Sequence, residues 1–121
     1  MALIQLITQD EIEQLTVLNN KFAPQVNQLD KSDLECIVTQ AKYSLYLTVG
    51  RNIAGFALAL EPGASYQSEN YQWFEKRYSE YLYIDRIVID NKYQSLGYGQ
   101  LLYNELKVLN GLHYCRFTCE R

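Results

Sequence analysis

The chain has 121 residues, of which 48% are hydrophobic and 21% charged, and its formal net charge at pH 7 is −3. This length and composition indicate one globular domain, 1–121, and exclude a disordered, collagen-like or low-complexity chain. The longest apolar run, Ile53–Leu60, is far shorter than the ~20 residues that cross a bilayer, and the acidic charge disfavours a nucleic-acid partner.

The chain opens with a predicted strand and a predicted helix. The strand covers Ile4–Ile7. Thr8, followed three residues later by Glu11, has the pattern of a capping box, which begins a helix. Apolar residues at helical spacing carry this helix from Ile12 until Pro24 ends it.

A second helix and a hairpin are expected next. The helix begins near Asp30 or Ser32, where either residue could cap it. Two β-rich segments follow, Tyr43–Val49 and Ile53–Leu60, and a turn with glycine separates them. This spacing predicts an antiparallel hairpin.

The second half of the chain is expected to form a loop, a strand, a helix and a last strand. These elements cover Glu61–Glu80, Tyr81–Ile89, Gly97–Asn110 and His113–Cys119. The order βααββ–βαβ predicts an α/β domain with a mixed, mostly antiparallel sheet. Since a helix joins the last two strands, those two are expected to be one parallel pair.

The cysteines and the histidine favour no metal site. Cys36, Cys115 and Cys119 make an odd number, and the first residues of the chain contain no basic segment typical of a signal peptide. Cys115 and Cys119 would lie about 13 Å apart on a strand, too far for a disulfide or a shared metal. With His113 as the single histidine, we expect reduced thiols, no metal and a cytoplasmic protein.

The segment after the strand Tyr81–Ile89 carries the strongest chemical signal. A buried strand leads into a short polar turn and then into a helix that begins with glycines, Gly97 and Gly99. Glycines allow a ligand to approach the backbone, and the first N–H groups of a helix point at one spot with about half a positive charge. This arrangement predicts a cradle for a phosphate or pyrophosphate.

The spacing of the glycines distinguishes between the known phosphate-binding motifs. A Rossmann fingerprint needs a third glycine or alanine where this chain has Leu102, and no P-loop string is present. The pattern Q/R-x-x-G-x-G/A is met by Gln94, Gly97 and Gly99 directly after a strand.

With this motif the chain resembles the GNAT acyl-CoA N-acyltransferases. The element order resembles theirs along the whole chain, and the resemblance is specific over about Tyr81–Glu120. It implies that acetyl-CoA is the acyl donor and that main-chain groups at the end of the strand bind its pantetheine arm. The residues implied for the arm are Ile87, Val88 and Ile89. The residues implied for the pyrophosphate are Gln94, Ser95, Leu96, Gly97, Tyr98 and Gly99.

The resemblance implies transfer of an acetyl group directly to an amine, either a small molecule or a protein amine. Four alternatives remain open. At the level of the motif, they are glycines that only permit tight packing and a cradle for another phosphate-bearing ligand. At the level of the domain, they are a catalytically silent CoA-binding module and a small interaction protein.

Two residues of the strand are candidate catalytic groups. Regular alternation would put Tyr83, Asp85, Ile87 and Ile89 on one face and Arg86 on the other. Asp85 is a candidate base or amine-binding carboxylate; an ion pair with Arg86 of a neighbouring element, or a hydrogen bond that shapes the strand, is the alternative. Tyr83 could order a water, or could be a packed aromatic at the cleft edge.

The acceptor side and the end of the chain give weaker expectations. The loop Glu61–Glu80 is aromatic and acidic, which suits either a cationic amine or a packed lid. The family resemblance implies a further helix and two strands after the last strand, whereas this chain ends at Arg121. The domain is therefore expected to be C-terminally shortened, and the open edge of His113–Cys119 favours a homodimer.

Overall fold

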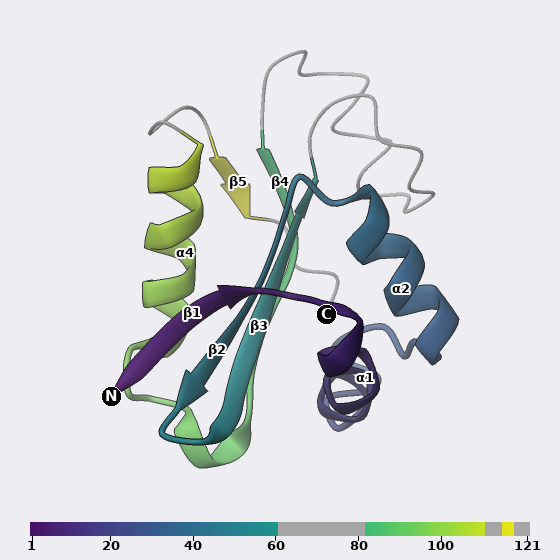
Figure 1. The fold of residues 1–121 in the computed structure, drawn as a ribbon, viewed down its shortest axis with the longest axis horizontal. Helices are drawn as coiled ribbons and strands as arrows, with labels where there is room; N and C mark the ends of the chain where they lie inside the picture. Colours follow the sequence, from purple (N-terminus) through teal and green to yellow (C-terminus); the bar gives the residue numbers. More distant parts are fainter. Residues whose placement is uncertain (61–81, 111–114, 118–121) are drawn as a thin grey trace.

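The computed structural model describes residues 1–60, 82–110 and 115–117, which form one sheet with helices on both faces (Figure 1). The strands are β1 (Ala2–Leu6), β2 (Tyr43–Val49), β3 (Asn52–Leu60), β4 (Leu82–Ile89) and β5 (Cys115–Phe117). They lie side by side in chain order. The pairs from β1 to β4 are antiparallel, and β5 pairs in parallel with β4.

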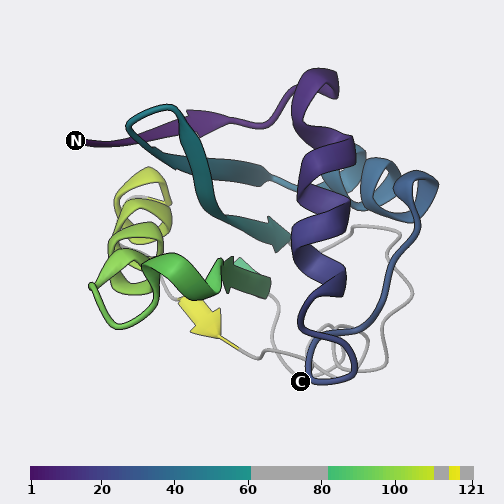
Figure 2. The ribbon, with the colours of Figure 1, turned by 90° about the horizontal axis from the view of Figure 1, so that it is seen from below.

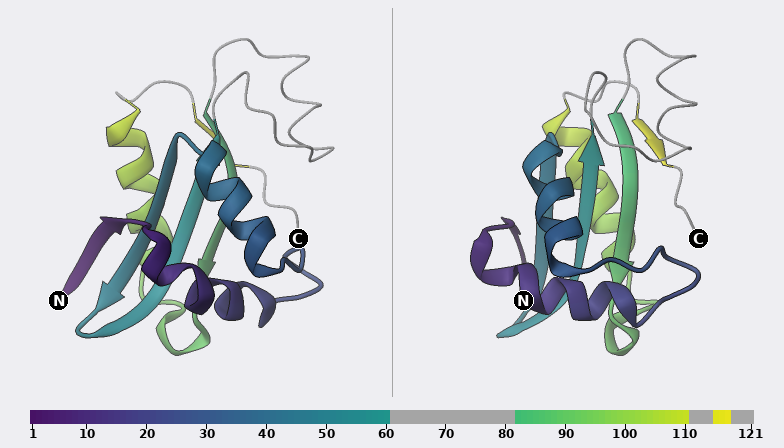
Figure 3. Two further views of the ribbon diagram at one scale, coloured as in Figure 1. Left: turned by 45° about the vertical axis from the view of Figure 1, so that its right-hand side comes forward. Right: turned by 90° about the vertical axis from the view of Figure 1, so that its right-hand side faces the viewer.

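The helices cover the two faces of this sheet separately. They are η1 (Gln9–Glu11), α1 (Ile12–Asn20), α2 (Lys31–Gln40), η2 (Asn91–Tyr93) and α4 (Tyr98–Leu109). Figures 2 and 3 show α1 and α2 on one face and α4 on the other. A separate apolar core lies on each side: Phe56 and Leu58 of β3 pack with α1 and α2, and Ala57 and Ala59 pack on the side of α4.

Local capping patterns set the starts of the first two helices. The predicted capping box is confirmed: the Thr8 N–H donates to Glu11 Oε1 at 2.7 Å, and the Asp10 N–H donates to Thr8 Oγ1 at 3.3 Å. The box begins η1, which leads directly into α1. Asp30 caps α2 in the same way, since its carboxylate accepts the Asp33 N–H at 2.8 Å.

Most predicted elements agree with the structure, and their bounds shift by a few residues. The first strand begins at Ala2, earlier than predicted, because its pairing with β2 already starts there, opposite Val49. The helix α1 ends at Asn20, before Pro24, because the next residues form short turns such as the bond from the Phe22 N–H to Asn19 O. The predicted α/β fold with a mostly antiparallel sheet is confirmed.

Some predictions fall on residues that the structure does not describe. These are the loop Glu61–Glu80, residue His113 and the last residues of the predicted strand His113–Cys119. Within the described parts of the chain, no helix has the length and apolar character needed to span a membrane.

Candidate functional site

The turn between β4 and α4 is tied back to the strand by Gln94. Its side-chain Nε2 donates to Ile89 O at 3.0 Å and to Asn91 Oδ1 at 3.3 Å. The turn itself closes with the bond from the Tyr93 N–H to Asp90 O at 2.8 Å. Gln94 therefore shapes the cradle with its side chain, a contribution that the motif alone did not show.

The backbone then turns twice through the left-handed region before the helix begins. Ser95 has φ 65° and Gly97 has φ 88°. Gly97 is the N-cap of α4, no side chain caps that end, and the helical bonds start with the Leu101 N–H donating to Gly97 O. Among the described residues, no acceptor is recorded for the N–H groups from Ser95 to Gln100. Such a row of N–H donors at a helix start suits an anion.

An open hollow of about 400 Å³ borders four residues of this stretch, Ser95, Gly97, Tyr98 and Gly99. It is lined by Ile87, Ile89, Tyr93, Gln94, Ser95, Gly97, Tyr98 and Gly99. A Cβ on Gly99 would meet only Ile89 Cγ1, at 3.9 Å, so the protein's own packing leaves room for a side chain there. The missing side chain keeps the backbone accessible from the hollow.

A second hollow of about 230 Å³ adjoins the first. Its lining residues are Phe22, Gln25, Val26, Ile87, Val88, Ile89 and Gln94. The two hollows share Ile87, Ile89 and Gln94, so they meet at the end of β4. Together they offer one wall of polar backbone at α4 and one mainly apolar wall at the connection after α1.

The main-chain groups at the end of β4 point alternately toward β3 and toward the outer edge of the strand. The Asp90 N–H donates to Ala54 O of β3, and successive residues of a strand direct their main-chain groups to opposite edges. The groups of Val88 thus point toward β3, and those of Ile87 and Ile89 point away from it. The described part of β5 pairs only with Leu82–Ile84, leaving the outer groups of Ile87 clear of it.

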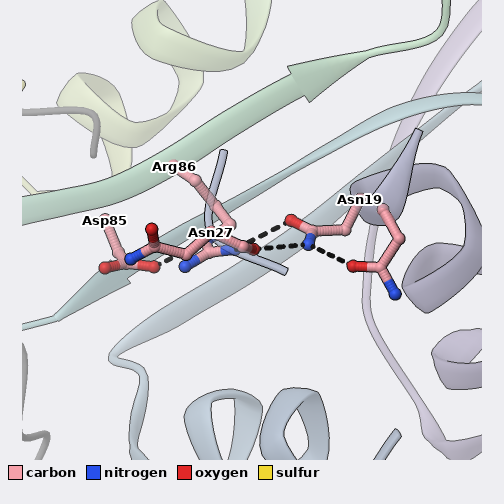
Figure 4. A network of polar contacts seen from close by, with 5 residues as sticks. Asn19, Asn27, Asp85 and Arg86 are labelled. Carbon is pink, nitrogen blue, oxygen red and sulfur yellow. Dashed lines mark hydrogen bonds and ion pairs between the residues drawn. The ribbon is translucent and has the colours of Figure 1, made fainter. Parts of the chain in front are cut away.

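A β-bulge at Asp85 breaks the alternation that the sequence pattern predicted. Ala59 pairs with Ile84 and Leu58 pairs with Arg86, so Asp85 is the extra residue that the bulge inserts into β4. The bulge brings Asp85 and Arg86 to the same face, as Figure 4 shows. The predicted grouping of Asp85 with Ile87 and Ile89 is therefore wrong, because those isoleucines face the core on the side of α4.

The charged pair at the bulge is almost completely buried. Arg86 Nε donates to Asp85 Oδ2 at 2.7 Å, and the two side chains are 1% and 0% exposed. This ion pair is the alternative that the sequence left open, but it joins neighbours on one strand rather than two elements. Tyr83 is also fully buried on β4.

Arg86 connects this pair to α1 through Asn19 and Asn27, two residues outside the sequence motif. Its Nη1 donates to Asn19 Oδ1 at 2.8 Å and to Asn27 O at 3.3 Å (Figure 4). Asn19 is fully buried, and its amide in turn donates to Asn27 O at 2.9 Å. A polar residue on the apolar face of α1 was the available signal, because buried amides need partners.

Comparison with known proteins reveals the fold. No protein-family model matches the chain, and no curated protein matches it. Its structure matches a ribosomal-protein-alanine N-acetyltransferase from Brucella melitensis at a TM-score of 0.72 and 15% identity, over 99% of this chain and 81% of that one. The fold is that of the GNAT N-acetyltransferases.

Two further GNAT structures match with similar geometry. The ribosomal-protein-S18-alanine N-acetyltransferase from Escherichia coli has a TM-score of 0.66 at 14% identity, over 90% of this chain. This chain spans only 59% of that protein's length. Naa50 from Arabidopsis thaliana, in complex with a bisubstrate analogue of CoA, has a TM-score of 0.67 at 13% identity over 98% of this chain and 70% of that one. At identities this low, the structural similarity establishes the fold alone.

Proposed function

We propose that the chain is an acetyl-CoA-dependent N-acetyltransferase. The observation that supports this most strongly is the row of N–H groups from Ser95 to Gln100, four residues of which line a hollow at the end of β4. A CoA donor carries one group suited to each of these features. Its pyrophosphate suits the N–H groups of the helix start, and its extended arm, which contains amides, suits the edge of a strand. The structure of Naa50, which has the same fold, is a complex with a bisubstrate analogue that contains CoA.

In this proposal, the backbone of the cradle binds the pyrophosphate and the strand end binds the arm. The N–H groups at Gly97 and Gly99 supply charge-assisted hydrogen bonds without a side chain in the way. Ile87 and Ile89 direct main-chain groups to the outer edge, where the arm's amides could pair. Phe22 and Val26 offer apolar surface to the arm's methylene groups across the second hollow.

The transfer itself joins the acceptor's nitrogen to the acetyl carbon while the bond from that carbon to the CoA sulfur breaks. The amine must be neutral to attack, and its proton finally passes to the thiolate. We propose Asp85 as the group that accepts this proton or binds the amine, and Tyr83 as its neighbour that orders a water. Both are buried, Asp85 at the bulge and Tyr83 two residues before it, so the proton would travel through water rather than by direct contact.

Calorimetric titration with acetyl-CoA and with S-acetylpantetheine tests the donor site. Acetyl-CoA should bind much more tightly, because the shorter probe lacks the pyrophosphate that the cradle binds. Equal binding of the two probes would refute the pyrophosphate placement, and no heat with either would refute the proposed function.

The proposal also covers the acceptor, the cellular location and the oligomeric state. We propose an amine acceptor, a cytoplasmic location and a homodimer. An acetyl-transfer assay over a panel of small amines and peptide N-termini tests the first, and light scattering tests the last. Binding of acetyl-CoA without transfer to any acceptor would favour the silent CoA-binding module instead.

A further inference from the structure

The connection between α1 and α2, residues 21–30, forms one wall of the second hollow. Phe22, Gln25 and Val26 line that wall, and the end of β4 lines the other. Val26 is 8% exposed and packs in the core with α1 and α2. The width of this hollow therefore depends on where the α1–α2 connection lies relative to β4.

A chain of hydrogen bonds anchors this connection to the strand. Arg86 binds Asn19 Oδ1 and Asn27 O, and the Asn19 amide donates to Asn27 O and to Asn20 Oδ1. Asn20 then holds Leu29 from both sides: its Nδ2 donates to Leu29 O at 2.7 Å, and its Oδ1 accepts the Leu29 N–H at 2.9 Å. The connection is thus held near its middle and near its end.

A second contact holds the start of the connection against the turn after β4. Lys21 Nζ lies 3.5 Å from Asp90 Oδ2. Lys21 is half exposed, so this ion pair contributes little on its own. The buried network around Arg86 is the stronger restraint, because each of its polar groups would cost free energy if left without a partner.

We propose that Arg86, Asn19 and Asn20 are positioning residues that hold the α1–α2 connection at the distance from β4 that the donor's arm requires. This inference rests on the proposed function, since the arm of acetyl-CoA is the occupant assigned to the second hollow. None of the three side chains lines either hollow. Their effect on the donor passes through Phe22 and Val26.

The bulge explains why a strand residue can perform this task. It brings Arg86 to the face of α1 and leaves Ile87 on the side of α4. One residue after the anchor, the strand therefore presents its outer edge to the ligand. The bulge at Asp85 therefore determines both the face on which Arg86 lies and the main-chain groups that β4 directs to its outer edge.

Asn20→Ala is the main test, because Asn20 is only half-buried and its loss leaves the buried charges in place. Tyr43→Phe is the matched control: it removes one hydrogen bond, from the Tyr43 hydroxyl to Leu109 O at 2.8 Å, at the far end of α4. Asn19→Ala is a second, more severe variant. Each is measured for amide hydrogen exchange, thermal unfolding and calorimetric affinity for acetyl-CoA.

Asn20→Ala removes three hydrogen bonds, one with Asn19 and two with Leu29. We expect it to speed exchange at the Leu29 N–H, which loses its acceptor, and at the Val26 N–H, which bonds to Phe22 O within the connection. We also expect it to weaken acetyl-CoA binding roughly three- to tenfold, a loss of the size of one or two hydrogen bonds. Tyr43→Phe removes one exposed hydrogen bond, so it should lower the melting temperature less than Asn20→Ala does and leave the affinity within about twofold, the scatter of a typical neutral surface change. Unchanged affinity in a folded Asn20→Ala would overturn the inference. An equal loss in both variants would also overturn it, because it would show a general stability effect.

A failure of the proposed function would look different. The wild type would then give no heat with acetyl-CoA, which overturns the donor part of the inference together with the function. Exchange at the Val26 N–H, whose acceptor is Phe22 O and not Asn20, would still decide the anchoring of the connection. Faster exchange of this N–H in Asn20→Ala supports the anchoring, and unchanged exchange rules it out.

Discussion

The cradle can be tested by placing a negative charge where the pyrophosphate is proposed to bind, through Gly99→Asp. Gly99 is the second residue of α4 and lines the larger hollow. A Cβ there meets only Ile89 Cγ1, at the ordinary contact distance of 3.9 Å. An aspartate in the first turn of a helix gains about 0.3–1 kcal/mol from the helix dipole, so the protein should remain folded and equally or more stable.

Binding should respond in the opposite direction to stability. The new carboxylate would compete for the same N–H groups and repel the phosphates. Loss of one charge-assisted hydrogen bond costs about 1.5–3 kcal/mol, which corresponds to roughly a ten- to hundredfold weaker affinity for acetyl-CoA. Calorimetry measures this loss, and thermal unfolding without ligand measures the stability of the same preparation.

Gly99→Asn separates charge from shape, because asparagine has nearly the same size as aspartate without its charge. We expect the asparagine variant to bind acetyl-CoA with an affinity between those of the wild type and Gly99→Asp. If Gly99→Asp is folded and binds as tightly as the wild type, the assignment of the anion to this helix start is refuted. If the two variants bind equally weakly, size rather than charge limits the site.

Three further predictions follow from other parts of the fold. Gly55→Ala should destabilise the protein by about 1–3 kcal/mol in denaturant unfolding, because a Cβ there would lie 2.5 Å from Val88 O, and a stable variant would contradict this. The pKa of Asp30 is lowered below 3.8, first by the backbone hydrogen bond from Asp33, so its stabilisation is present above about pH 4 and is lost in more acidic solution. Asp30→Ser keeps a cap without a titrating group and should flatten the acid side of the melting-temperature profile. Asp85→Asn should lower turnover much more than it lowers acetyl-CoA affinity, and unchanged turnover would remove Asp85 from the proton path.

The parts of the fold that depend on neighbouring residues were predictable from the sequence. The capping box at Thr8, the cap at Asp30 and the hairpin of β2 and β3 each involve residues a few positions apart. The cradle is similar, because the strand end, turn and helix start that form it are contiguous. The run of N–H groups from Ser95 to Gln100 therefore follows from a local pattern, and its role as a binding site stays a prediction.

The contacts that bring distant residues together could not be read from such patterns. Arg86 and Asn19 are 67 positions apart, and nothing local to either residue specifies the other. The α1–α2 connection likewise reaches the site only through the packing of α1 on the sheet. A buried asparagine in α1 signals that a partner exists without showing which residue it is.

The bulge at Asp85 could have been inferred from the charges rather than from the apolar pattern. Both faces of β4 are covered, so its apolar residues show no alternation that would reveal a slip of one position. Two opposite charges next to each other in a buried strand give another constraint. Each needs a partner nearby, and on a regular strand they would point to opposite faces.

A bulge removes that conflict by turning both side chains to one face, and the 2.7 Å ion pair is the result. The pairing also determines how Asp85→Asn must be measured. The substitution takes away the carboxylate that accepts from Arg86 Nε, so it should lower stability as well as turnover. Turnover per folded molecule, with the folded fraction measured at the assay temperature, is the quantity that separates a proton-transfer role from the support of a buried charge.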